Sequence, residues 1–103
     1  MEFINFQIED SIAWIRLNRP QVYNSFHQGM ATECIHLLNE IQENDAIRCV
    51  VITGEGKAFC AGQDLQEAMD PNGPSLEKIL KEHYNPIIEK IRNLNKPVIA
   101  AVN

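Results

Sequence analysis

The sequence predicts an α/β fold, in which helices pack on a partly parallel sheet. Two short apolar runs without alternation, at residues 48–53 and 98–102, are typical of buried parallel strands. One long segment before the first run, and another between the two runs, repeats apolar residues with helical spacing. The predicted order is strand, strand, helix, strand, interrupted helix and strand, within one domain over residues 1–103.

Residues 3–17 are predicted to form a half-buried β-hairpin, because apolar and polar residues alternate there. Phe3, Phe6 and Ile8 lie among polar residues in the first half. In the second half, the face opposite Arg16 carries Ala13, Ile15 and Leu17. Pro20 then ends the pairing, since proline has no amide to donate.

The first helix is predicted to begin at Ser25, an N-cap residue with Gln28 in the capping-box position. Its apolar residues recur at i, i+4, i+7, i+8 and i+11, which gives one buried stripe. These residues are Met30, Cys34, Leu37, Leu38 and Ile41. The helix is expected to end near Asn44.

The second long helix is predicted to start at Ser75 and to end at Lys96-Pro97. Pro86 lies within it and removes one backbone donor, so we expect a kink or a break there. The strand at 98–102 is expected to be buried, yet no helix follows it to cover its second face. The sequence therefore reads as a fold that ends midway.

Composition excludes several classes of protein. Apolar residues make up 45% of the chain and the formal net charge is −5, the opposite of the balance typical of duplex-binding proteins. No apolar run approaches the roughly 18 residues that span a bilayer. The three cysteines show no close spacing, which favours a reducing compartment. We expect a globular cytoplasmic protein without nucleic-acid or membrane partners.

Residues 57–65 (KAFCAGQDL) carry the most informative pattern, because they follow a predicted parallel strand and a glycine-rich turn. Ala61 and Gly62 let a ligand approach the backbone closely. Free amides near Gln63 and Asp64, if a helical turn begins there, are suited to stabilising negative charge as an oxyanion hole. The alternative is a plain strand-to-helix connection in which Asp64 is an ordinary first-turn acid.

Three segments together resemble the crotonase (enoyl-CoA hydratase/isomerase) superfamily. They are LNRPQVYNS at 17–25, AFCAGQDL at 58–65 and KPVIAAVN at 96–103. The resemblance implies the N-terminal part of the ββα spiral of that family, ending in mid-fold. A narrower resemblance, from residues 63–65 and from Tyr84-Asn85-Pro86, is to the epoxyphenylacetyl-CoA isomerase branch.

The resemblance implies roles for seven residues. The backbone N–H of Gln63 is expected to hold the thioester oxygen of an acyl-CoA substrate. The pantetheine and adenine path is expected to run past Ala61, Gln63, Asp64, Leu65 and Gln66, with Gln21 and Val22 beside the nucleotide. Many family members have lysine or arginine where this chain has Gln21 and Gln66, so weaker phosphate contacts are expected.

The resemblance implies that coenzyme A is the part of the substrate by which the protein binds it. It implies no metal or redox cofactor. In this family the second oxyanion donor, the catalytic acids and the helices of a trimer or hexamer come later than the position of Asn103. Two hypotheses stay open. The chain is the N-terminal portion of an acyl-CoA hydratase or isomerase and is inactive alone, or it is an inactive fragment that binds coenzyme A or assembles with another chain.

Other candidate groups have simpler interpretations. Gly54-Glu55-Gly56-Lys57 lacks the first glycine and the Ser or Thr of a phosphate loop. Cys60 is favoured as a space-filling residue over a nucleophile. The three histidines, His27, His36 and His83, share no metal-ligand spacing, although His83 lies beside Tyr84 near the expected acyl pocket. Glu67 and Asp70 are favoured as surface acids over general bases.

Overall fold

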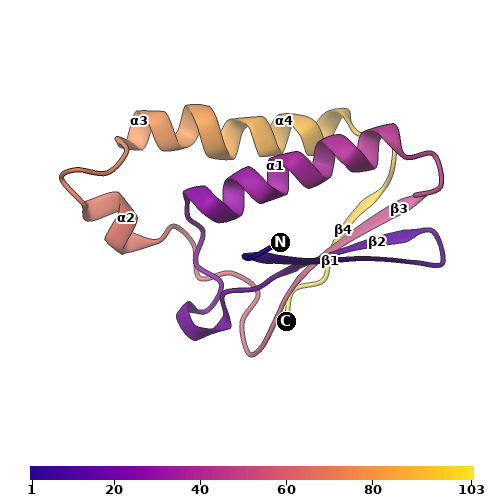
Figure 1. Ribbon diagram of the computed structural model, residues 1–103, viewed down its shortest axis with the longest axis horizontal. Coiled ribbons are helices and arrows are strands. Elements are labelled where there is room, and N and C mark those ends of the chain that lie inside the picture. The colour runs from indigo at the N-terminus through magenta and orange to yellow at the C-terminus, as the bar shows by residue number, and fades with distance from the viewer.

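A computed structural model describes residues 1–103 and shows a four-stranded sheet with the helices on one face (Figure 1). The strands are β1 (Ile4–Glu9), β2 (Ile12–Leu17), β3 (Cys49–Gly54) and β4 (Val98–Ala100), and they lie in that order across the sheet. β1 and β2 are antiparallel, whereas β3 is parallel to both β2 and β4. The predicted α/β class and the predicted order of elements along the chain are confirmed.

The β1–β2 hairpin buries Ala13, Ile15 and Leu17, as the alternation predicts. In β1, however, Ile4 is the buried residue and Ile8 is 47% exposed. The two strands are joined by Asp10 and Ser11, which both have positive φ. Two successive residues of this kind form the hairpin turn that matches the twist of the strands.

Helix α1 (Gln28–Glu43) buries the whole predicted stripe, and Asn44 is its C-cap. Its predicted start at Ser25 is wrong, because His27 is the N-cap and accepts a hydrogen bond from the Met30 amide at 3.3 Å. The backbone of Phe26 is engaged in a parallel bridge with Gln63, which holds the chain extended up to the cap. The capping box centred on Ser25 therefore does not form.

The second long helix is interrupted, as predicted. Ser75 caps α3 (Leu76–Ile79), a π-helical turn follows over Leu80–Tyr84, and α4 runs over Asn85–Asn93. The wider π turn lies directly before Pro86, where an α-helix loses a donor and proline crowds the preceding turn. The helix ends before Lys96, whose ammonium instead donates to the carbonyls of Ile41 and Asn44.

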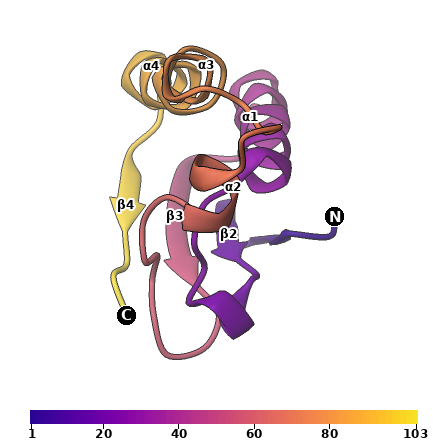
Figure 2. The ribbon, with the colours of Figure 1, turned by 90° about the vertical axis from the view of Figure 1, so that its left-hand side faces the viewer.

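The predicted burial of the last strand is wrong, since β4 is an edge strand. Ile99 is 52% exposed, and Val98 alone in this strand packs against the core. Figure 2 shows β4 at the margin of the sheet, away from α1. The apolar core lies instead mainly between α1 and strands β1–β3, and its cluster of 13 buried residues also includes Ile87 of α4. None of the helices combines the length and the apolar run that crossing a bilayer would require.

Candidate functional site

Two loops far apart in the sequence, at 19–26 and 58–67, meet beside the start of α1. The Phe26 amide donates to the Gly62 carbonyl at 2.7 Å, and the Asp64 amide donates to the Phe26 carbonyl at 2.8 Å. Because residues 62 and 64 supply both contacts of this parallel bridge, the N–H and C=O of Gln63 point away from Phe26. The Gln63 N–H has no hydrogen-bond partner within the chain. It is a fixed donor that is left unpaired.

The backbone at Gly62 supports this arrangement. Its φ is +102°, a conformation that side-chain-bearing residues rarely adopt, although the space around its Cα is open. The requirement for glycine therefore comes from the turn and not from crowding. Gly54 is different, since an added Cβ would lie 2.6 Å from the carbonyl oxygens of Ala58 and Phe59. The 58–67 loop thus crosses directly over the end of β3.

A fully buried asparagine ties the two loops together. The Asn24 amide group donates to the carbonyls of Glu55 and Ala58 at 2.9 and 2.8 Å, and its oxygen accepts from the Arg19 amide at 2.7 Å. Asn24 has φ +57°, which asparagine tolerates better than most residues. Sequence reasoning missed this residue, because its partners lie up to 34 positions away.

Asp64 has two structural roles at the start of α2 (Leu65–Met69). One oxygen accepts from the amides of Gln66 and Glu67 at 2.9 and 3.3 Å, and the other pairs with Arg19 at 3.1 Å. Burial acts to raise the pKa of Asp64, but the hydrogen bonds from the Glu67 amide and the Arg19 guanidinium outweigh it and lower the pKa below 3.8. Of the amides expected to be free near Gln63 and Asp64, that of Gln63 is unpaired, whereas that of Asp64 donates to Phe26 and Asp64 itself occupies those of residues 66 and 67.

The Gln63 side chain belongs to a small polar cluster. The Tyr84 hydroxyl donates to its Oε1, and its Nε2 lies 3.5 Å from the Glu67 carboxylate. Glu67 in turn accepts from the Gln28 amide at the start of α1, at 3.0 Å. Burial, together with the nearby Cys60 and Glu67 side chains, raises the pKa of Tyr84, so its hydroxyl stays a donor at neutral pH.

A cavity of about 490 Å³ opens beside this segment. The structure brings together six of the seven residues that the sequence predicts for substrate binding. The lining consists of Val22, Ser25, Ala61, Gln63, Asp64, Leu65 and Gln66. Gln21 is not part of it and lies exposed in the 3₁₀ turn Pro20–Val22, while Ser25 joins the lining without having been predicted.

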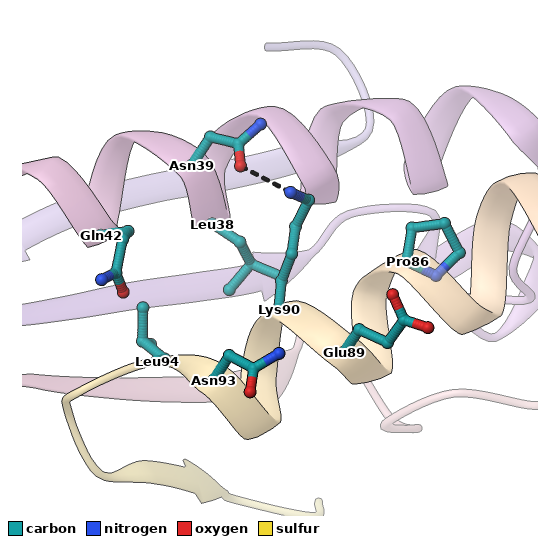
Figure 3. Close-up of a pocket in the computed structure, with 8 residues that line it drawn as sticks. All are labelled: Leu38, Asn39, Gln42, Pro86, Glu89, Lys90, Asn93 and Leu94. Carbon is teal, nitrogen blue, oxygen red and sulfur yellow. Dashed lines mark hydrogen bonds between the residues drawn. The ribbon is translucent and has the colours of Figure 1, made fainter.

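A second cavity, of about 390 Å³, lies between α1 and α4 (Figure 3). Its charged residues are Glu89 and Lys90, and the Lys90 ammonium donates to Asn39 Oδ1 at 2.8 Å. No cysteine, histidine or hydroxyl group lines it. Of these two cavities, only the one at Gln63 is lined by residues that the sequence predicts for substrate binding.

The remaining reactive side chains have structural surroundings. Burial raises the pKa of the Cys34 thiol to about 12, which keeps it protonated inside the core. Cys60 is half-buried, and its sulfur accepts from the Gly62 amide at 3.4 Å. His83, in the π-helical turn, is only 5% exposed. No group of three or more His, Cys, Asp or Glu side chains is arranged to hold a metal ion.

Comparison with known proteins shows the family of this chain. Residues 7–103 match the family model described as enoyl-CoA hydratase/isomerase, so the chain belongs to that family and the predicted resemblance is confirmed. It is 42% identical over 106 residues to 1,2-epoxyphenylacetyl-CoA isomerase of Escherichia coli K12, covering 100% of this chain and 40% of that protein. It is 38% identical to a probable enoyl-CoA hydratase of Rhodobacter capsulatus, covering 97% of this chain and 38% of that protein.

Solved structures agree. The crystal structure of an enoyl-CoA hydratase from Mycobacterium smegmatis superposes with a TM-score of 0.87 at 30% identity, covering 99% of this chain and 40% of that one. The chain therefore has the crotonase fold over the part that it spans. That part is about two-fifths of the length of these relatives.

Proposed function

We propose that this chain supplies the thioester-binding part of an acyl-CoA hydratase or isomerase site. The observation that carries the proposal is the unpaired N–H of Gln63, fixed by the Phe26 bridge at the wall of the cavity. In the proposed complex this amide donates to the thioester oxygen. The bond strengthens as negative charge develops on that oxygen in the enolate-like transition state, which is how such donors accelerate a reaction.

The cavity suits the coenzyme A arm of such a substrate. Val22 and Leu65 offer apolar surface to the pantetheine, while Gln66, and Gln21 as the exposed neighbour of Val22 in the chain, offer amide groups toward the nucleotide. Two of the relatives carry names of enzymes that act on coenzyme A thioesters. The thioester itself makes the neighbouring proton acidic once its oxygen is held, so the proposed reaction draws on no metal or redox cofactor. We further propose a cytoplasmic homo-oligomer as the working form.

One amide donor does not complete such a site. An oxyanion hole normally uses two donors, and the reaction also needs a general acid or base close to the substrate. Glu67 is held by the Gln28 amide, and Asp64 by Arg19 and the α2 amides. These residues are thus committed to structure, and we expect residues 1–103 by themselves not to hydrate crotonyl-CoA.

Binding tests the proposal directly. Isothermal titration calorimetry of the protein purified from its natural source, with hexanoyl-CoA as the ligand, is expected to show saturable binding. Leu65→Asp places a carboxylate in the cavity wall and is expected to weaken this binding at least about tenfold, through repulsion of the phosphates. Met69→Asp is the matched control, because Met69 lies on the same helix, is 78% exposed and does not line the cavity. Equal effects of the two substitutions, or no binding, would contradict the proposal.

A second candidate function is an inactive crotonase-like unit that binds coenzyme A or assembles with another chain. The exposed edge at β4 favours it, with Ile99 52% and Val102 72% exposed. Sedimentation velocity over a range of concentrations tests assembly through this edge. Association that Ile99→Lys abolishes supports the second candidate, whereas a monomer at all concentrations counts against it.

A further inference from the structure

One aromatic side chain touches both groups that fix Gln63. Tyr84 stacks on Phe26, the bridge partner of Gln63, and donates its hydroxyl to the Gln63 side chain. We propose that Tyr84 is a positioning residue that aims the Gln63 amide at the thioester oxygen. This inference rests on the proposed function and adds to it a residue that reaches the site through Gln63.

The stacking contact restrains the bridge from one side. The rings of Tyr84 and Phe26 lie 5.7 Å apart between centroids with 30° between their planes. Phe26 also contributes its backbone N–H and C=O to the contacts with Gly62 and Asp64. Movement of the Phe26 ring would therefore tilt the backbone segment that presents the Gln63 N–H.

The hydrogen bond restrains Gln63 itself. The other end of its side chain makes only long contacts, with Nε2 at 3.4 Å from the Asp64 carbonyl and 3.5 Å from Glu67. Hydrogen bonds of this length are weak. The bond from the Tyr84 hydroxyl is consequently the firmest restraint on this side chain, and the rest of the residue is held only by the bridge.

The backbone of the second helix explains how Tyr84 reaches this point. Tyr84 is the last residue of the π-helical turn Leu80–Tyr84, and α4 begins directly after it. A π turn inserts one extra residue, so its removal would rotate Tyr84 by about 100° around the helix axis. Pro86 favours this interruption of the α-helix. The turn thus serves to direct Tyr84 toward Gln63.

A spectroscopic test separates aiming from folding. The probe is hexanoyl-CoA with a ¹³C-labelled carbonyl, whose stretching frequency falls when a donor polarises it. The carbonyl band of the bound probe is compared between the protein purified from its natural source, Tyr84→Phe, Gln63→Met and the double variant. Tyr84→Phe keeps the ring on Phe26 and loses only the hydroxyl. Tyr23→Phe is the matched control, because Tyr23 is the other tyrosine, is 58% exposed and makes no side-chain hydrogen bond.

Tyr84→Phe is expected to retain its circular dichroism, to reduce the red shift of the bound carbonyl, and to lower affinity roughly fivefold, the effect of one neutral hydrogen bond. Adding Tyr84→Phe to Gln63→Met is expected to change nothing further. An unchanged red shift in Tyr84→Phe, or additive effects in the double variant, would overturn the role of Tyr84 alone. Absence of a red shift in the unsubstituted protein would overturn the proposed function itself.

Discussion

The core beneath α1 and the wall of the Gln63 cavity are held together by different forces. The core is a cluster of 13 buried side chains, of which Ile15, Leu37 and Ile41 are almost inaccessible to water. The cavity wall instead depends on a buried asparagine and a largely buried ion pair, Arg19–Asp64, whose side chains are 13% and 14% exposed. Apolar packing is shared among many contacts, whereas each polar contact in the wall has no substitute.

This difference predicts how each region responds to substitution. A cavity in the core is expected to cost stability but to leave the Gln63 amide in place, because the polar contacts that fix the two loops stay intact. A broken hydrogen bond in the wall displaces the loops that present the amide. Four substitutions, taken from the largest expected effect on stability to the smallest, test this separation.

Leu37→Ala is expected to lower the free energy of unfolding by about 3 kcal/mol, since it leaves a cavity at a residue that is 2% exposed. Urea denaturation measures this loss. Affinity for hexanoyl-CoA, measured under conditions where the variant is folded, is expected to stay unchanged. Leu76→Ala is the control, because Leu76 is 66% exposed. A marked loss of affinity in Leu37→Ala would show that core and site are coupled.

Asn24→Ala is expected to cost about 2 kcal/mol, because it leaves partly buried backbone groups of Arg19, Glu55 and Ala58 without partners. Unlike Leu37→Ala, this substitution is also expected to weaken hexanoyl-CoA binding. Asn95→Ala, at an exposed asparagine without side-chain hydrogen bonds, is the matched control. Loss of stability with unchanged affinity would break the link between Asn24 and the site.

Asp64→Asn is expected to cost about 1 kcal/mol at pH 7, because it removes the charge that Arg19 faces while an asparagine still caps α2. The pKa of Asp64 is lower in the folded chain than its ordinary value of 3.8. Its charge therefore stabilises the fold above about pH 3.8, and the stabilisation is lost as the pH falls through the folded-state pKa. Urea denaturation is expected to show the difference between variant and parent shrinking from pH 7 to pH 3; a constant difference would contradict the account.

His27 is expected to give the smallest effect, a pH dependence at the start of α1. Burial, and then the Arg19 charge, lowers the pKa of His27 below 6.5 in the folded chain. The unfolded chain thus binds more protons below about pH 6.5, so stability falls as the pH drops through that value. His27→Asn keeps a capping oxygen without titrating, and thermal melts are expected to show a shallower fall than in the parent between pH 7.5 and 5.5. His36→Asn, at the exposed partner of Glu40, is the control; an equal slope in His27→Asn would contradict the assignment.

The elements that were predictable from the sequence are those whose pattern is local. The stripe from Met30 to Ile41 and the cap at Ser75 depend on spacings within a helix, and the structure confirms both. The start of α1 was not predictable in this way, because the Phe26 bridge is made with residues 36 to 38 positions further along the chain. The edge position of β4 likewise depends on what surrounds a strand and not on its own apolar residues.

The candidate site likewise contains residues that a local sequence pattern predicts and residues that it does not. The AFCAGQDL segment indicates Gln63, and six of the seven residues predicted for the site, Gln63 included, line one cavity. Asn24 and Tyr84 lie in segments that carry the family resemblance, but their contacts with this segment span 21 to 34 positions and were not predictable from a local pattern. In the structure, Asn24 stands out by its positive φ, and Tyr84 stands out because it precedes the proline at the start of α4.

The central claim is that the Gln63 N–H donates to the thioester oxygen. The most direct measurement replaces Gln63 by its α-hydroxy acid, which exchanges this N–H for an ester oxygen and keeps the side chain. The infrared band of the ¹³C-labelled carbonyl of bound hexanoyl-CoA is then compared with that in the unsubstituted protein. We predict that the ester variant loses much of the red shift and still binds the ligand. A red shift of the same size in both proteins would contradict the claim.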